Sequence, residues 1–139
     1  MIAKEQMKRP LISQPIKKTA IIGAGSWGTA LAKLLADKGE QVLLWSHRAE
    51  HVDALRRDRE NRKYLPGAAL PGNLRAVNTF DDLPSCQCVV MGVPSHGFRE
   101  VFKRIIPQLQ DGTSLVSAVK GIEIATRQTM CQVMQEELA

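Results

Sequence analysis

The sequence predicts an α/β fold built on a doubly wound, parallel sheet. Three observations lead to this prediction. Short apolar runs alternate with stretches in which apolar residues recur at helical spacing. The first apolar run breaks directly into a glycine-rich turn. The chain of 139 residues is long enough to bury the core of one domain, and its sequence contains no internal repeat.

The glycine-rich turn has the spacing of a dinucleotide site. Thr19–Ile22 is expected to be a buried strand, and Gly23, Gly25 and Gly28 follow in the pattern G-x-G-x-x-G. We expect Gly23 to allow a sharp turn, Gly25 to leave room for a pyrophosphate, and Gly28 to let the next helix pack closely. The free amides at the start of that helix would face the phosphates. This context indicates a Rossmann-type fold; the alternative is a packed strand-to-helix turn without a ligand.

The second strand, Gln41–Trp45, is expected to end where such folds select their cofactor. An acid there hydrogen-bonds the ribose hydroxyls of NAD, whereas a cation accommodates the 2′-phosphate of NADP. Ser46, His47 and Arg48 follow the strand, and the first acid is Glu50. This order favours NADP, or the use of both NADP and NAD, over NAD alone. The alternative is that Arg48 is a solvated start to the next helix.

The middle of the chain is polar. Ala49–Lys63 carries alternating charges, which predict a solvated surface helix. A loop rich in proline and glycine follows through Gly72, and Leu74–Val77 predicts a short third strand. Tyr64 has two interpretations: its ring stacks against an adenine, or it caps the core.

Two further strands complete the predicted sheet. Cys88–Val93 is a continuous apolar run, typical of a central parallel strand, and Val93–His96 at its carboxyl end should border the cofactor. A helix follows, and His96 at its start is either an acid or base or simply polar. Ser114–Val119 predicts the fifth strand. Lys120 directly after it could hold a phosphate, polarise a carbonyl oxygen, or be idle. Thr126–Leu138 has the apolar spacing of a packed helix.

Charge and composition argue against several classes of partner. The net charge is +5, but residues 1–18 carry five basic side chains and one acidic one, so the remainder is close to neutral. That distribution argues against nucleic-acid binding, and we interpret residues 1–18 as a frayed, solvated leader. No apolar run approaches the roughly 20 residues that span a bilayer. The leader lacks the apolar core of a signal peptide, so a cytoplasmic protein is expected.

The cysteines do not have the pattern of a metal site. Cys86 and Cys88 form one close pair, Cys131 is distant, and no histidine flanks them. An odd number of cysteines is also unlike a disulfide scaffold. We therefore expect no metal and three free thiols.

Several motifs in this order resemble the bacterial NAD(P)-dependent glycerol-3-phosphate dehydrogenase family. The resemblance runs from about Lys18 to the last residue. KGIE after the fifth strand is the part least expected by chance. The motifs that carry it are GAGSWGTALA at 23–32, LWSHR at 44–48, NRKYLPG at 61–67, VPSH at 93–96 and KGIE at 120–123.

The resemblance implies an enzyme that interconverts dihydroxyacetone phosphate and sn-glycerol 3-phosphate with a nicotinamide cofactor, for phospholipid synthesis. It also implies that the lysine matching Lys120 touches the substrate as well as the cofactor. A homodimer is expected for the full-length protein. The residues that match the family's cofactor site are Ser26, Trp27, His47, Arg48, Tyr64 and Lys120, in addition to the three glycines.

The family's proteins are much longer than this chain, and the resemblance implies that they continue into a helical substrate domain. Their general-base lysine is expected beyond Ala139. The doubly wound order also calls for a sixth strand, without which Ser114–Val119 would be an exposed edge. We therefore expect a leader over residues 1–18 and an incomplete cofactor domain over residues 19–139, inactive by itself. Two alternatives are a related hydroxy-acid or sugar-acid dehydrogenase and a non-catalytic dinucleotide-binding module.

Overall fold

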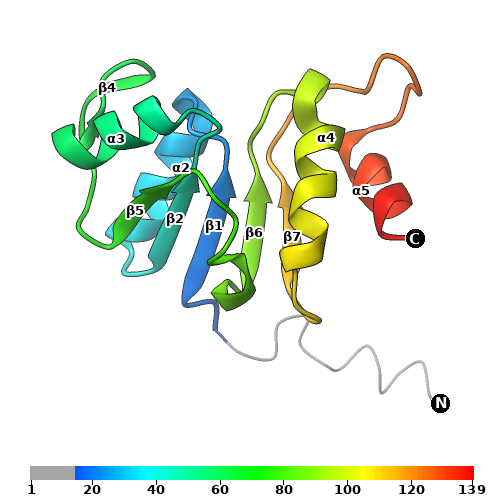
Figure 1. The fold of residues 1–139 in the computed structure, drawn as a ribbon, viewed down its shortest axis with the longest axis horizontal. Coiled ribbons are helices and arrows are strands. Elements are labelled where there is room, and N and C mark those ends of the chain that lie inside the picture. Colours follow the sequence, from blue (N-terminus) through cyan, green and yellow to red (C-terminus); the bar gives the residue numbers. More distant parts are fainter. Residues whose placement is uncertain (1–14) are drawn as a thin grey trace.

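A five-stranded parallel sheet forms the centre of the computed structural model, which describes residues 15–139. The strand order is β5-β2-β1-β6-β7 (Figure 1), so the five expected strands are arranged in the doubly wound order 3-2-1-4-5. Every neighbouring pair in this sheet is parallel. The strands are β1 (Lys18–Ile22), β2 (Gln41–Trp45), β5 (Leu74–Val77), β6 (Cys88–Met91) and β7 (Ser114–Ser117).

Helices cover both faces of the sheet, which confirms the doubly wound fold. The helices are α2 (Ser26–Asp37), α3 (Ala49–Asp58), α4 (Ser95–Ile105) and α5 (Met130–Leu138). Successive strand residues point to opposite faces. Ile22 therefore belongs to the cluster that packs on α4 and α5, while Ile21 belongs to the cluster that packs on α2 and α3. Phe98 and Phe102 of α4 are completely buried between helix and sheet.

The pairing register aligns the carboxyl ends of the strands. Ile22, the last residue of β1, pairs with Trp45 on one side and with Met91 on the other. Met91 in turn pairs with Ser117, the last residue of β7. The turns that leave these strands therefore meet at one edge of the sheet, at the upper end in Figure 1.

The segment after β2 differs from the prediction. The expected helix over 49–63 ends at Asp58, because Arg59 adopts a left-handed conformation with φ 51°. The Arg59 guanidinium then donates to the carbonyl oxygens of Leu70, Pro71 and Leu74. An antiparallel hairpin follows, in which β3 (Glu60–Asn61) replaces the end of the expected helix and β4 (Leu65–Ala69) lies within the expected loop.

Other boundaries shift by a few residues. The strands expected over 88–93 and 114–119 end at Met91 and Ser117. The helix expected over 126–138 begins at Met130, because Thr129 caps it and forms a reciprocal capping box with Gln132. Two short 3₁₀ segments, η1 (Leu83–Ser85) and η2 (Ile106–Gln108), complete the fold.

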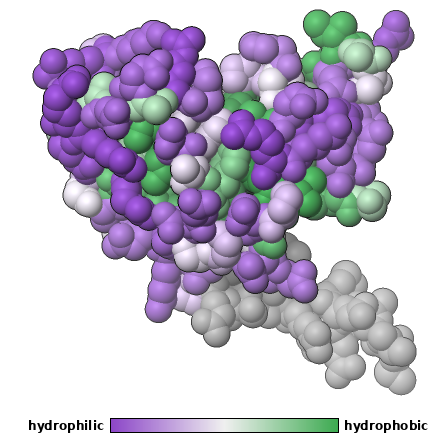
Figure 2. Space-filling model, viewed as in Figure 1, coloured by the Kyte–Doolittle hydropathy of each residue, from purple (hydrophilic) through white to green (hydrophobic). Residues whose placement is uncertain are grey.

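The predicted leader over 1–18 lies largely outside the described residues. Within them, Ile16 packs against the cluster beneath α2 and α3, and the Lys17 amide donates to Gln87 Oε1 at 2.7 Å. At the opposite edge, β7 pairs with β6 alone among the strands described. Apolar side chains are exposed on the loop after β7, where Ile124 is 90% exposed (Figure 2). Within residues 15–139, no helix is long and apolar enough to cross a membrane.

Candidate functional site

A cavity of about 590 Å³ opens at the carboxyl ends of the central strands. Three turns line it: the glycine turn over 23–28 after β1, residues 45–48 after β2, and residues 92–94 after β6. The side opposite these turns is formed by α3 and by the β3–β4 hairpin. The cavity therefore lies where an open α/β sheet places its ligands.

The glycine turn is packed tightly on one side and is open on the other. Gly23 has φ 125°, and a Cβ atom there would lie 2.7 Å from the Gly92 carbonyl carbon. A Cβ atom on Gly28 would lie 1.9 Å from the Gly23 carbonyl oxygen. A Cβ atom on Gly25 would meet nothing within 4 Å. Gly25 lines the cavity, so the turn leaves a free cradle at the position where the pattern predicts a pyrophosphate.

Helix α2 presents its amino terminus to this cradle. Gly25 is its N-cap and provides no side-chain cap, and the first turn contains no acidic residue. The first amides of a helix lack intrahelical acceptors, and the helix dipole favours an anion near them. Ser26 and Trp27 of this turn line the cavity, and Trp27 is 60% exposed. The cradle and the free amides fit the pyrophosphate of a dinucleotide.

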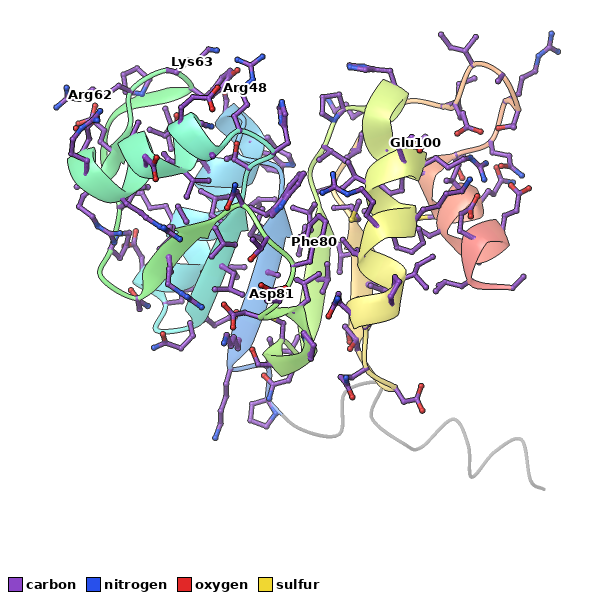
Figure 3. The ribbon with its side chains drawn as sticks, viewed as in Figure 1. Arg48, Arg62, Lys63, Phe80, Asp81 and Glu100 are labelled. Carbon is purple, nitrogen blue, oxygen red and sulfur yellow. The ribbon has the colours of Figure 1, made fainter. Side chains whose placement is uncertain are left out.

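Basic side chains and one acidic side chain line the cavity near the turn after β2. Arg48 and His47 are exposed, and Arg48 Nε lies 3.3 Å from His47 Nε2. Glu50 follows on the first turn of α3 and lines the same cavity. Lys63 and Arg62 approach from the hairpin, at the same end of the molecule as Arg48 (Figure 3). The rim of the cavity therefore carries groups that can bind a phosphate or a ribose hydroxyl.

Tyr64 lines the cavity and belongs to neither core cluster. Its ring contacts His51 edge-on, with 5.6 Å between the ring centroids. The Lys63 ammonium lies 5.1 Å from the centre of the Tyr64 ring. This position is that of an aromatic wall of the cavity, and the Tyr64 ring does not cap the core.

Sequence reasoning missed three residues at this site. Gly92 packs its backbone against the glycine turn, and a Cβ atom there would lie 3.4 Å from the Ile22 carbonyl oxygen. A glycine inside an apolar strand run is a signal for such a close approach. Asn61 is buried and hydrogen-bonds His51 at 3.2 Å, beside the cavity. Asn61 begins the NRKYLPG motif, but no local pattern assigns a role to its side chain or to that of His51.

Lys120 and His96 lie outside the cavity lining. Lys120 is exposed in the loop after β7, and a Cβ atom on the adjacent Gly121 would lie 3.8 Å from Ser95 Oγ. Ser95 follows Pro94, which lines the cavity, so the lysine lies near its rim. His96 is exposed on the first turn of α4, so the expectation that residues up to 96 border the cavity holds only through Pro94.

An ion cluster anchors the loop that carries Lys120. Arg99 of α4 donates to both carboxylate oxygens of Glu123, at 2.8 and 2.9 Å. Arg99 also contacts Glu136 and Glu137 of α5. The Arg99 guanidinium, and then the Thr126 hydroxyl, lower the pKa of Glu123 from 4.5 to about 2. The cluster joins α4, α5 and the loop between β7 and α5.

Cys86, Cys88 and Cys131 are free thiols in the structure, and burial raises the pKa of the Cys86 and Cys88 thiols. Cys131 is exposed on α5. In the part of the chain from residue 15 onward, no group of three or more histidine, cysteine or acidic side chains is placed to hold a metal ion.

Comparison with known proteins gives consistent relatives. The family model described as "NAD-dependent glycerol-3-phosphate dehydrogenase N-terminus" matches residues 18–139. A glycerol-3-phosphate dehydrogenase [NAD(P)+] of Desulfotalea psychrophila is 53% identical over 121 residues, which are 86% of this chain and 36% of the relative. One of Pelotomaculum thermopropionicum is 46% identical over 86% of this chain and 35% of the relative.

A solved structure agrees with these sequences. The glycerol-3-phosphate dehydrogenase of Coxiella burnetii superposes with a TM-score of 0.83 at 35% identity, over 93% of this chain and 38% of that one. The chain spans just over a third of the length of the curated relatives named here. Because the family model covers nearly all of the described residues, the predicted resemblance is confirmed. This chain belongs to the family of the NAD-dependent glycerol-3-phosphate dehydrogenase N-terminus.

Proposed function

We propose that this chain is the cofactor-binding part of an enzyme that interconverts dihydroxyacetone phosphate and sn-glycerol 3-phosphate with NADPH or NADH. The observation that carries the proposal is the open cradle at Gly25, set against the amino terminus of α2. The nicotinamide cofactor supplies or accepts a hydride when bound. Phospholipid synthesis is the process that such an activity would supply. Dimerisation of the full-length protein and a cytoplasmic location remain predictions.

We assign the phosphates of the cofactor to the glycine turn. The amides of Ser26 and Trp27 would donate to the pyrophosphate, which would lie over Gly25. Gly23 and Gly28 would act indirectly, by keeping the turn close to β6 and to α2. These roles are supported by the cavity lining, which contains all five of these residues.

We assign the adenosine end to the turn after β2 and to the hairpin. Arg48, with His47 beside it, would meet the 2′-phosphate of NADP, and Glu50 would meet the ribose hydroxyls of NAD. Tyr64 would form an aromatic wall for the adenine. The presence of a cation and an acid in one cavity supports the use of both cofactors.

We assign Lys120 to the rim nearest the reacting end of the cofactor. An ammonium group there would hold a substrate oxygen and stabilise negative charge that develops on it. The ion cluster around Arg99 would keep this loop in place. The general base is expected in the part of the relatives that this chain does not span.

A fluorescence titration of the 139-residue chain tests the proposal. Trp27 lies in the cavity and is exposed, whereas Trp45 is buried and stacked on Phe80 at 4.8 Å between ring centroids. NADPH and NADH should each quench Trp27 emission with saturation, and Trp27→Phe should remove most of the change. A folded chain that binds neither cofactor would contradict the proposal. If the complete enzyme oxidises NADPH with another carbonyl compound and not with dihydroxyacetone phosphate, the substrate assignment is wrong.

A further inference from the structure

A partly buried chain of hydrogen-bonded polar side chains connects two of the turns that line the cavity. Its members are Ser46, His51 and Asn61, and we call them the polar chain. Asn61 is 1% exposed, and its Nδ2 donates to the Ala24 carbonyl oxygen at 3.0 Å and to Thr29 Oγ1 at 2.8 Å. Ala24 is part of the glycine turn, so this side chain holds the turn directly.

The neighbouring backbone groups fix the orientation of the Asn61 amide. The Ala24 carbonyl can only accept, so it faces the amide nitrogen. The Tyr64 N–H can only donate, and it lies 3.3 Å from Oδ1. Both hydrogens of Nδ2 and the oxygen therefore have partners, and a buried amide in this state is fully satisfied.

His51 connects Asn61 to Ser46 within the polar chain. Its Nε2 lies 3.2 Å from Asn61 Oδ1, and because that oxygen only accepts, Nε2 must carry a proton. Its Nδ1 lies 3.1 Å from Ser46 Oγ, within hydrogen-bond distance. The Arg48 amide points to the same hydroxyl oxygen at 3.5 Å. The polar chain thus runs from the Arg48 backbone to the Ala24 carbonyl.

We propose that Asn61 is a positioning residue for the dinucleotide site, because it fixes the glycine turn relative to the turn after β2. This inference rests on the proposed function, since those turns would hold the pyrophosphate and the adenosine end of one ligand. A ligand that touches both turns requires a fixed distance between them. Asn61 contributes to it through Ala24, in addition to the backbone hydrogen bond from the Gly23 amide to the Trp45 carbonyl oxygen.

Asn73 provides a matched control. Its Nδ2 also bridges two backbone carbonyls, those of Ala36 and Glu40, each at 2.7 Å. These carbonyls lie at the end of α2 and before β2, away from the cavity lining. Asn73→Ala therefore removes a similar pair of bonds without touching either turn.

The experiment compares Asn61→Ala, Asn61→Asp and Asn73→Ala in the 139-residue chain. NADPH affinity is measured by titration, thermal unfolding by circular dichroism, and the Ala24 carbonyl ¹³C shift by NMR without ligand. Asn61→Asp keeps an oxygen toward His51 and places another against the Ala24 carbonyl. Ser46→Ala, which removes only one hydroxyl, serves as a further variant of the polar chain should the Asn61 variants fail to fold.

Both Asn61 variants should weaken NADPH binding by about tenfold, because the glycine turn loses the side chain that holds it in place. They should move the Ala24 shift, whereas Asn73→Ala should leave that shift and the affinity unchanged. Ser46→Ala should weaken NADPH less than Asn61→Ala. Folded Asn61 variants with wild-type affinity, or an equal loss in Asn73→Ala, would overturn the inference and leave the proposed function intact. If the wild-type chain binds neither NADPH nor NADH, the proposed function itself fails.

Discussion

The carbonyl oxygen of Gly23 lies 1.9 Å from the point that a Cβ atom on Gly28 would occupy. Gly25, between them in sequence, has open space at the same point. Two glycines of one motif are therefore subject to different requirements. Gly28 is required by the protein itself, and Gly25 is required only by what binds in the cavity.

This difference predicts opposite results for two alanine variants. Gly28→Ala should lower the free energy of unfolding by about 3 kcal/mol or more, because the added carbon overlaps backbone that cannot move away. Gly25→Ala should cost at most about 1 kcal/mol, the loss expected at an N-cap. Gly25→Ala should nevertheless weaken NADPH strongly, and Gly25→Val should abolish its binding. Urea unfolding and NADPH titration of each variant check this; a folded Gly25→Val protein with unchanged affinity would contradict the motif assignment.

Arg48 should distinguish the two cofactors. Arg48→Ala should weaken NADPH by about tenfold and NADH much less, because only NADPH carries the 2′-phosphate that a guanidinium can bind. Arg62→Ala is the control, since Arg62 also lines the cavity but lies 4.0 Å from Glu60 as an ion pair. The ratio of the two dissociation constants is the measurement. Equal losses for NADPH and NADH in Arg48→Ala would show that Arg48 does not bind the 2′-phosphate.

The Arg99–Glu123 pair should make stability depend on acid pH. The folded-state pKa of Glu123, about 2, is below its ordinary value of 4.5. The stabilisation is therefore complete above about pH 4.5 and is lost as the pH falls toward 2. The difference in unfolding free energy between wild type and Glu123→Gln should be constant at neutral pH and should shrink through this range. Glu100→Gln, an exposed position on α4, should show no such trend; a pH-independent difference for Glu123→Gln would refute the prediction.

Lys120 should affect turnover more than cofactor binding. In a complete enzyme that contains this chain, Lys120→Ala should lower kcat/KM by about 10²-fold, as expected for the loss of a group that stabilises developing charge. NADPH binding should change little, because Lys120 lies outside the cavity lining. His96→Ala, on the neighbouring first turn of α4, is the control and should leave turnover near wild type. Normal turnover in Lys120→Ala would remove this residue from the proposed mechanism.

The sequence predicted the sheet because its strands are continuous apolar runs, and buried parallel strands require such runs. Thr19–Ile22 and Gln41–Trp45 were placed within one residue of β1 and β2 for this reason. The glycine turn was also predictable, because the demands on its backbone are local. The hairpin of β3 and β4 was missed, since its pairing depends on the left-handed turn at Arg59 and on contacts with distant carbonyls.

The hydrogen bonds of the polar chain could not be predicted from the sequence. Asn61 bonds Thr29 and Ala24, which are 32 and 37 residues away. Asparagine in a charged stretch is ordinarily solvated, and only the tertiary fold buries this one. Gly92 was a different case. A glycine inside an apolar run is a local signal for close backbone approach, but the run was interpreted only as a strand.

The position of β1 in the middle of the sheet has a consequence for the order of assembly. β1 can pair with β2 as soon as α2 has formed. Its other edge must wait for β6, and Gln87 at the start of that pairing is 69 positions after Lys18. Closing so long a loop is slow compared with forming the nearer crossover. During synthesis the Gly23 turn is therefore exposed on one side until Gly92 arrives. The cavity at this edge of the sheet is thus completed only when β6 has paired with β1, and the cofactor that we propose for it would bind only to chains that have completed this step.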